Sequence, residues 1–312
     1  MTKYAKIISS GSYLPEKILT NKELENIVDT TDEWITERTG IKERRISSKN
    51  ETSVDMAYNA SIEAINKSDI NKDDIGAIFL ATCTPERKFP STAVLLQNKL
   101  DIKNAFSFDI NAACTGFVYA LDVAKKYIET GQIKYALVVG TEKITSLLDW
   151  NDRNTCVLFG DGSGAMIIGE SNSPGIMSST IGSDGSYKDL LTVNTDLDYI
   201  EMKGSDVFKT AVNTLGKLAK HTLEINNLSQ DKLDWLVPHQ ANERIILAIA
   251  KKINLPKEKI IITVNKHGNT SAASIPLAFD TANSKNTFKP GEIIMLEAFG
   301  AGFTWGSILL KY

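Results

Sequence analysis

Residues 105–129, AFSFDINAACTGFVYALDVAKKYIE, combine a short apolar strand, a turn of small residues and a longer amphipathic helix. Residues 260–282, IIITVNKHGNTSAASIPLAFDTA, repeat this order in the second half of the chain. Cys114 and Asn269 hold matching places in the two stretches, 155 residues apart (269 minus 114). Self-similarity at the spacing of one domain indicates a duplicated α/β unit.

The similarity extends beyond these two stretches. In each half a strand and a helix come first, and an apolar strand with a glycine-rich β segment follows. Hydrophobic periodicity and cap residues therefore predict an α/β fold with two pseudo-duplicated halves, 1–170 and 171–312. The predicted strands are 75–82, 105–110, 135–139, 233–237, 260–264 and 292–297, and the predicted helices are 53–66, 91–100, 114–129, 206–225, 242–253 and 271–282.

Composition excludes several classes of protein. The 312 residues are 42% hydrophobic and 23% charged, which is typical of compact globular chains. A net charge of -3 gives no overall attraction to nucleic acid or to an anionic membrane, and no apolar run is long enough to span a bilayer. The N-terminus has no secretory signal pattern, and three cysteines at unrelated spacings favour neither a disulfide framework nor a zinc site. We expect a cytoplasmic protein without metal.

Cys114 is the first candidate for chemistry. It follows a predicted strand and opens a predicted helix, where the helix dipole favours a thiolate. Its neighbours Ala112, Ala113, Thr115 and Gly116 are small enough to let a substrate approach. This feature alone leaves a second interpretation open, that Cys114 is a buried inert thiol. Cys83 and Cys156 lie in strand-like apolar runs and are predicted to be core residues.

Two of the three histidines fall near the same seam. His239 follows a predicted strand, and His267 and Asn269 lie in the turn after the next one. Ligand sites in such sheets gather at the carboxyl ends of strands, so these turns should face Cys114. We predict a supporting role for His267 and a solvent-exposed position for His221, on a helix rich in charged residues.

Two features of the sequence suggest other functions. A cysteine followed by a histidine and then an asparagine is also the order of papain-like proteases, but the chain lacks their Cys-Gly-Ser-Cys-Trp type signature. The glycine-rich FGDGSGA at 159–165 lacks the Lys-Ser/Thr of a phosphate-binding loop, so a tight turn between strands is predicted.

The segments around these residues, AACTGF, PHQAN and HGNTSAAS, resemble those of the β-ketoacyl-acyl carrier protein synthase III family. The resemblance spans the chain and includes GSYLPEKILTN, DEWITERTGIKERR, FPSTA and EAFGAGFTWGS. It implies a thiolase-type fold, layered α-β-α-β-α, and a homodimer. It also implies a condensing acyltransferase of fatty-acid synthesis without a cofactor. Cys114 would carry an acyl group from a short acyl-CoA and condense it with malonyl-acyl carrier protein, with loss of CO₂.

The resemblance also implies roles for individual residues. His239 and Asn269 would donate hydrogen bonds to the malonyl thioester oxygen as enolate charge develops. The backbone N–H groups of Cys114 and Ala301 would hold the acyl oxyanion, although family members often have Gly-Gly-Gly where this chain has Gly-Ala-Gly. The remaining positions are Trp34, Arg38 and Arg153 for CoA, Phe89 for the acyl pocket of the partner subunit, and Lys209, Arg244, Lys251 and Lys252 for the carrier protein.

Three alternatives remain at this stage. A degradative thiolase is disfavoured because EAFGAGFTWGS lacks the additional cysteine of that chemistry. A relative from secondary metabolism that uses malonyl-CoA would share the Cys114, His239 and Asn269 set. A non-catalytic module that binds the carrier protein would keep the fold and the basic residues. The sequence leaves the preferred acyl chain open, because one methylene changes selection by only about 1 to 3 kcal/mol.

Overall fold

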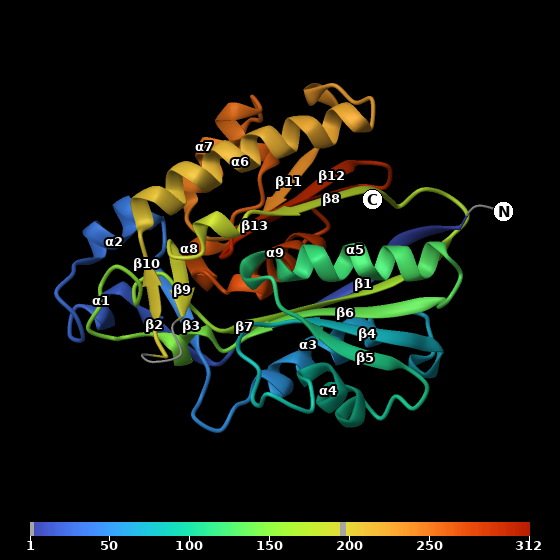
Figure 1. The fold of residues 1–312 in the computed structure, drawn as a ribbon, viewed down its shortest axis with the longest axis horizontal. Coiled ribbons are helices and arrows are strands. Elements are labelled where there is room, and N and C mark those ends of the chain that lie inside the picture. Colours follow the sequence, from blue (N-terminus) through green and yellow to red (C-terminus); the bar gives the residue numbers. More distant parts are fainter. Residues whose placement is uncertain (1–2, 194–197) are drawn as a thin grey trace.

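The computed structural model describes residues 3–193 and 198–312. Two sheets are stacked face to face, with helices between them and on both outer faces (Figure 1). The layers therefore run α-β-α-β-α, as the sequence predicted. Within the described residues, no helix is long and apolar enough to cross a membrane.

The first sheet has the strand order β1-β7-β6-β4-β5. Helices α3 and α4 cover its outer face (Figure 1). Helix α3 begins where the side chains of Thr52 and Asp55 bond reciprocally to each other's backbone N–H, a capping box that satisfies free donors of the first turn. The bounds are β1 Tyr4–Tyr13, β4 Ile75–Ala81, β5 Phe106–Ile110, β6 Tyr135–Glu142, β7 Gly162–Ser171, α3 Ser53–Asn66 and α4 Thr92–Leu100.

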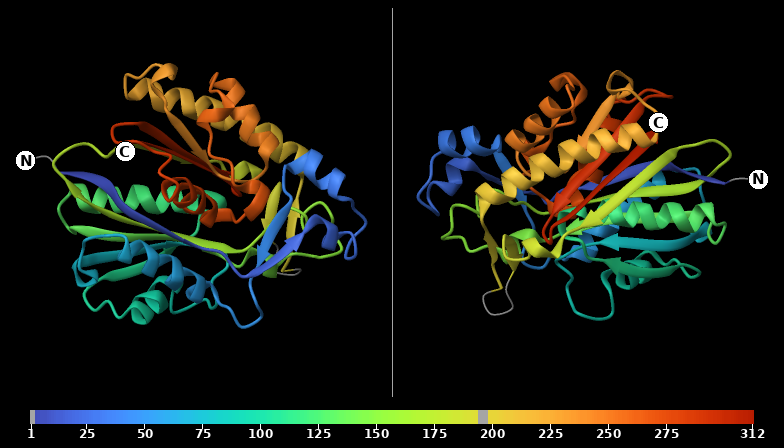
Figure 2. Two further views of the ribbon diagram at one scale, coloured as in Figure 1. Left: turned by 180° about the vertical axis from the view of Figure 1, so that it is seen from behind. Right: turned by 45° about the horizontal axis from the view of Figure 1, so that its top comes forward.

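The second sheet has the order β11-β12-β13-β8, and helices α6 and α7 lie on its outer face (Figure 2). Between the two sheets lie α5 and α9, whose apolar residues join those of both sheets in one core. The bounds are β8 Ile176–Ser183, β11 Trp235–Pro238, β12 Ile293–Gly300, β13 Thr304–Lys311, α5 Gly116–Glu129, α6 Gly204–Ile225, α7 Glu243–Lys252 and α9 Ser274–Asn283.

The two sheets follow the same plan. Strands β8, β13, β12 and β11 take the places that β1, β7, β6 and β4 take in the first sheet. The two central helices each follow a short 3-10 turn, Ala113–Thr115 before α5 and Ser271–Ala273 before α9. The first sheet is built from residues 4–171 and the second from 176–311. We keep the division into halves 1–170 and 171–312 as a prediction.

One predicted strand, 260–264, is wrong. Only Ile260 forms a bridge, to Leu236, and α8 (Val264–His267) begins where the strand was expected to end. The reason is a side chain, because Gln240 Oε1 accepts hydrogen bonds from the backbone N–H groups of Thr263 (2.8 Å) and Val264 (3.1 Å). These donors are satisfied without a strand partner, so the position equivalent to β5 stays irregular.

Two small two-stranded sheets and two short helices complete the fold at one end of the molecule (Figure 1). They project beyond the stacked sheets on the side where α6 begins. Their bounds are β2 Lys17–Thr20 with β3 Glu43–Ile46, β9 Leu191–Val193 with β10 Ile200–Met202, α1 Asn21–Leu24 and α2 Asp32–Thr39.

Candidate active site

Cys114 lies in the 3-10 turn that joins β5 to α5. Its side chain is buried, with 8% of its surface exposed. Helix α5 begins at Gly116 rather than at Cys114. Ala113 has a left-handed backbone conformation (φ 46°), so the chain becomes regularly helical only after the thiol. The predicted helix start is thus wrong by two residues, while the cysteine still sits at the head of the helix.

The predicted lowering of the Cys114 pKa is also wrong. Burial raises the pKa of the thiol to about 11, a hydrogen bond with Ser271 lowers it, and the charge of Glu142 raises it further. Desolvation therefore outweighs the favourable end of the helix dipole. Near neutral pH the group is a neutral thiol, and a base must take its proton before it can attack.

His239 follows β11 and is held from two sides. Its backbone N–H donates to Glu297 O (2.7 Å), and its Nδ1 lies 2.6 Å from Ser274 Oγ. Because Gln240 N–H already donates to this hydroxyl oxygen, we assign the hydroxyl proton to the bond with Nδ1. The imidazole proton then sits on Nε2. Burial lowers the pKa of His239 to about 3, so the ring is a neutral hydrogen-bond donor.

Asn269 is fixed through both its backbone and its side chain. Its N–H donates to Leu158 O (2.8 Å), and its carbonyl accepts from Gly160 N–H (3.0 Å). The side-chain Oδ1 accepts from Ser271 N–H (2.9 Å). Since the oxygen of the amide is engaged, its NH₂ group is the end available to a substrate.

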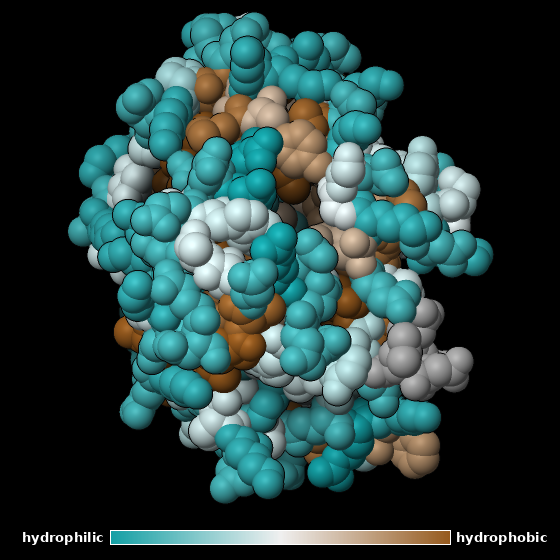
Figure 3. All heavy atoms as spheres, turned by 90° about the vertical axis from the view of Figure 1, so that its left-hand side faces the viewer, coloured by the Kyte–Doolittle hydropathy of each residue, from teal (hydrophilic) through white to brown (hydrophobic). Residues whose placement is uncertain are grey.

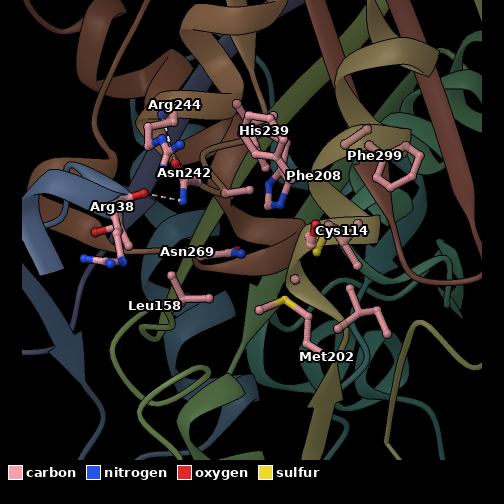
Figure 4. Close-up of a pocket in the computed structure, with 18 of the residues that line it drawn as sticks. Arg38, Cys114, Leu158, Met202, Phe208, His239, Asn242, Arg244, Asn269 and Phe299 are labelled. Carbon is pink, nitrogen blue, oxygen red and sulfur yellow. Dashed lines mark hydrogen bonds between the residues drawn. The ribbon is translucent and has the colours of Figure 1, made fainter. Parts of the chain in front are cut away.

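These three side chains line one cavity of about 800 Å³. In Figure 4, His239 and Asn269 point toward the space beside Cys114, each from a different segment of the chain. Met202 and Phe299 close the apolar sides of this space. Figure 3 shows the face at the open end, where hydrophobic residues are visible in a recess bordered by hydrophilic ones. The cavity thus joins a nucleophile and two donors to the surface.

Toward the surface the cavity is lined by Trp34 and Arg38 of α2. Two guanidinium groups lie over the Trp34 ring, that of Arg38 at 4.6 Å and that of Arg153 at 5.0 Å from the ring centroid. Arg153 also donates to the carbonyl of Asp29 (3.0 Å). An indole with two planar cations close to its ring is suited to stacking interactions at the mouth of the cavity.

Comparisons with known proteins agree with this geometry. Residues 108–185 match the model of 3-oxoacyl-[acyl-carrier-protein (ACP)] synthase III, and residues 223–312 match that of its C-terminal part. The chain is 51% identical to the β-ketoacyl-[acyl-carrier-protein] synthase III of Thioalkalivibrio sulfidiphilus, with 99% of each chain covered. The chain belongs to the 3-oxoacyl-[acyl-carrier-protein] synthase III family.

Solved structures give the same assignment for the fold. The synthase III of Aquifex aeolicus is 47% identical and has a TM-score of 0.97. The match covers 99% of this chain and 100% of that one. The synthase III of Thermus thermophilus is 37% identical, with a TM-score of 0.95 over 98% of this chain and 99% of its own. The thiolase-type fold is confirmed, and the chain is a condensing acyltransferase. The matches do not favour the secondary-metabolism enzyme or the non-catalytic module.

In this synthase III chain the end of β12 lies directly against the Cys114 turn. A Cβ on Gly300 would come within 2.9 Å of Cys114 N and 3.1 Å of Thr115 N. No side chain fits at this position, because real Cβ contacts do not approach so closely. Ala301 follows at once and is half-buried, so the Gly-Ala-Gly sequence keeps glycine where the contact requires it.

The predicted docking residues divide into two pairs. Lys209 of α6 and Arg244 of α7 line the mouth of the cavity, and the Arg244 guanidinium lies 5.8 Å from the Phe208 ring centroid. Lys251 and Lys252 lie exposed at the far end of α7, where Lys252 bonds to Asn213 (2.6 Å). Of the four residues, only Lys209 and Arg244 therefore lie at the cavity that contains Cys114.

Phe89 lies outside the cavity of its own chain. It is 84% exposed in the loop between β4 and α4, an unusual position for a large apolar side chain. On the neighbouring edge strand β5, Phe106 and Phe108 are 40% and 37% exposed. The role predicted for Phe89 in the partner's pocket stays a prediction.

Sequence reasoning missed several polar residues around the thiol. Cys83 is not part of a strand, because β4 ends at Ala81, and its Sγ lies 3.3 Å from Glu142 Oε1. Glu142 and Ser271 were not considered, since a carboxylate at the end of an apolar strand gives no sequence signal of its own. Cys156 is a fully buried core residue, as predicted.

The other two histidines lie outside the cavity. His267 is buried, with its Nδ1 lacking a hydrogen-bond partner in the part of the chain that the structure describes. Burial and nearby cations lower its pKa to about 4. Its carbonyl packs against Gly160, so a supporting role in the turn remains our interpretation. His221 is exposed on α6, as predicted.

Proposed function

We propose that this chain starts fatty-acid synthesis by a two-step condensation. Cys114 takes an acyl group from a short acyl-CoA such as acetyl-CoA, and malonyl-acyl carrier protein then loses CO₂ and attacks the carried acyl group. One observation carries the proposal, which is that Cys114, His239 and Asn269 line a single cavity that opens beside Trp34. Side chains and substrates supply all of this chemistry, without a metal or cofactor.

In the first step the sulfur of Cys114 attacks the thioester carbonyl of the acyl-CoA. A thiolate is both a good nucleophile and a good leaving group, so a carried thioester divides one difficult reaction into two easier ones. The negative oxygen that forms would accept hydrogen bonds from the backbone N–H groups of Cys114 and Ala301. Their spacing depends on the contact between Gly300 and the Cys114 turn.

Replacing Gly300 with alanine should slow acylation of Cys114 by about 10²-fold, because the new Cβ would push the Cys114 N–H away from the developing oxyanion. Ala301→Gly is the matched control, since it leaves the backbone donor in place, and we expect less than about a twofold change. The time course of the acyl adduct, followed by intact-protein mass spectrometry, measures both. An unchanged rate in Gly300→Ala would show that this contact does not set the donor geometry.

In the second step His239 Nε2–H and the Asn269 amide would donate to the malonyl thioester oxygen. These bonds strengthen as decarboxylation moves charge onto that oxygen, which is how such donors lower a barrier. The resulting carbanion attacks the acyl carbon, and the sulfur of Cys114 leaves. The neutral state of His239 suits this role, because the ring can donate without first acquiring a proton.

Trp34, Arg38 and Arg153 would bind the CoA portion of the first substrate. An adenine between Trp34 and Arg153 needs about 7 Å between them, twice a van der Waals contact. The guanidinium is now 5.0 Å from the Trp34 ring centroid, so Arg153 would have to move aside to admit the base. Its side chain is partly exposed and contacts Asp29 through a hydrogen bond to the carbonyl and an ion pair at 3.8 Å, so Arg153 can move without breaking a buried contact. Arg38 would meet a phosphate.

Trp34→Ala should raise KM for acetyl-CoA about tenfold with little change in kcat, because it removes the stacking partner of the adenine but not the reacting groups. Steady-state kinetics with acetyl-CoA and with acetyl-pantetheine, which lacks the adenine, make the comparison. The variant should handle acetyl-pantetheine as the parent protein does. An equal loss with both substrates would mean that Trp34 acts through the fold instead.

The other proposed partners meet different surfaces. Lys209 and Arg244 would receive the acidic carrier protein at the cavity mouth, with Lys251 and Lys252 extending the basic surface along α7. A homodimer would pair the exposed edge strand β5 and cover Phe89, Phe106 and Phe108. Three free cysteines fit a reducing cytoplasm.

A choice of second substrate tests the proposed function. Purified protein, acetyl-CoA and either malonyl-acyl carrier protein or malonyl-CoA are incubated, and the 3-oxoacyl product is quantified by mass spectrometry. We expect product from malonyl-acyl carrier protein at a rate at least about tenfold above that from malonyl-CoA. Equal rates would point to the secondary-metabolism reaction, and no product from either would contradict a condensing role.

A further inference from the structure

Glu142, at the end of β6, is a completely buried carboxylate close to the nucleophile. Its Oε2 accepts from Thr84 Oγ1 (2.6 Å) and Thr82 Oγ1 (3.3 Å), and its Oε1 accepts from Ser271 Oγ (3.2 Å). No Lys, Arg or His side chain pairs with it in residues 3–193 and 198–312. The fold therefore keeps an acid here, surrounded by hydroxyl and thiol groups rather than by a cation.

Ser271 connects this acid to Cys114. Its hydroxyl donates to Glu142 Oε1 (3.2 Å), and Ser271 and Glu142 both influence the pKa of the Cys114 thiol. The turn that carries Ser271 packs against the turn that carries Cys114. It also lies so close to β6 that a Cβ on Gly140 would come within 2.4 Å of Ala272 O. Tight backbone packing thus keeps the Ser271 hydroxyl and the Glu142 carboxylate beside the turn that carries the thiol.

Acylation requires that a proton leave the Cys114 thiol, whose pKa is raised to about 11. His239 is a poor acceptor, because burial lowers its pKa to about 3. Burial raises the pKa of Glu142, while its hydrogen bonds to Thr84, Cys83 and Ser271 oppose this. A carboxylate with a raised pKa is the stronger base of the two, and proton transfer is most effective when the acceptor approaches the donor in pKa.

We propose that Glu142 is the base that receives the Cys114 proton through the hydroxyl of Ser271. The proposal rests on the proposed function, since it assigns the proton that the first step must release. Ser271 Oγ takes the proton from Cys114 Sγ while its own hydroxyl proton passes to Glu142 Oε1. The sulfur forms its bond to the acyl carbon, the bond from that carbon to the CoA sulfur breaks, and the CoA thiolate takes a proton from water.

The second step returns the proton. When the carbanion attacks the carried acyl group, the bond between the acyl carbon and Cys114 Sγ breaks and the electron pair stays on sulfur. Glu142 gives its proton to Ser271, which gives one to Cys114. The thiol and the carboxylate are then restored. The buried site thus holds one proton throughout and never needs both an ionised acid and an ionised thiol.

The groups that face Glu142 come from three segments. The loop after β4 supplies Thr82, Cys83 and Thr84, the Ser271–Ala273 turn supplies Ser271, and the Ala113–Thr115 turn supplies Cys114. Cys83 is the only other titratable group in contact among the described residues, and its pKa is raised well above the ordinary value by burial, Glu142 and Cys114. Lys143 follows in the chain, but its Nζ bonds to the carbonyls of Ser48 and Glu51 instead.

Alkylation of Cys114 by iodoacetamide tests this relay without any acyl-CoA. Glu142→Gln should slow the reaction about 10²-fold at pH 7, and its rate should recover only as hydroxide replaces the missing base at higher pH. If Glu142 only repelled the thiolate, the alkylation rate should change in the opposite direction. Removing the carboxylate would then lower the Cys114 pKa and speed alkylation. Peptide mapping by mass spectrometry, carried out from pH 6 to 9, measures the alkylation rate of Cys114 separately from that of Cys83.

Two further variants keep the test decisive. Ser271→Ala retains Glu142 but removes the hydroxyl of the relay, so it should slow alkylation by a similar factor. If Glu142→Gln fails to fold, this variant still tests the proposal. Glu297→Gln is the matched control, because Glu297 is an equally buried carboxylate whose side-chain oxygens make no hydrogen bond within the described residues, and it should leave the rate unchanged. A parent-like or faster rate in both Glu142→Gln and Ser271→Ala would overturn the relay. Failure of the parent protein to acylate from acyl-CoA, with normal alkylation, would instead overturn the proposed function.

Discussion

Replacing Cys114 with alanine should abolish the acyl adduct and reduce condensation by about 10⁶-fold, the size of effect that follows removal of a covalent nucleophile. The variant still has His239 and Asn269 in the cavity, so it loses the carried intermediate but not the donors. Intact-protein mass spectrometry after exposure to acetyl-CoA measures the adduct, and product analysis with malonyl-acyl carrier protein measures the condensation.

The other two thiols provide controls for this result. Cys156→Ala should still acquire one acyl group, because Cys156 is fully buried in a core cluster that does not include Cys114. Cys83 also lies near Glu142, so mapping the adduct to a peptide is needed to separate it from Cys114. An adduct that persists in Cys114→Ala at a parent-like rate would place the nucleophile elsewhere.

The second large effect is expected in the condensation step alone. His239→Ala should lower the rate of decarboxylative condensation by about 10²- to 10³-fold while Cys114 is still acylated, because the side chain stabilises enolate charge and does not carry the acyl group. Pre-acylated protein mixed with malonyl-acyl carrier protein isolates this step. Asn269→Ala should show the same separation, since its NH₂ group is the free end of a fixed amide.

The pH dependence of this step provides a check on mechanism. His239 has its pKa lowered to about 3, so it stays neutral and able to donate through Nε2 from pH 8 down to about pH 4. The condensation rate of acylated protein should therefore show no loss near pH 6.5, where an unperturbed imidazole takes up a proton. A fall in rate as pH drops through 6.5 that is absent from His239→Ala would contradict the neutral-donor role.

Much of the fold could be predicted from local sequence patterns. Helix α3 was predicted with its observed bounds, and β4, β6 and β12 lie within a few residues of their predicted ranges. The duplication was readable because strand and helix periodicities recur in the same order in both halves. The predicted strand at 260–264 failed for a reason that periodicity cannot show, because a side chain from another segment, Gln240, takes the backbone donors of Thr263 and Val264.

The site shows a similar limit. Cys114 and His239 could be brought together because each follows the end of a strand, and strand ends define where a cavity can form. Asn269 was placed beside them from the predicted strand 260–264, and it lines the cavity although that strand does not form. The ionisation of Cys114 could not be predicted, since it depends on how completely the neighbouring layers exclude water from the sulfur. Glu142 and Ser271 were missed for the same reason, because their importance comes only from their distances to the thiol.

The close approach of Ala272 to Gly140 and the bonds that tie Asn269 to residues 158 and 160 have a mechanical consequence. They join the two halves of the chain beside the reacting groups. The two halves therefore cannot open away from each other at this point. A substrate must therefore reach the sulfur through the open end of the cavity and leave by the same route.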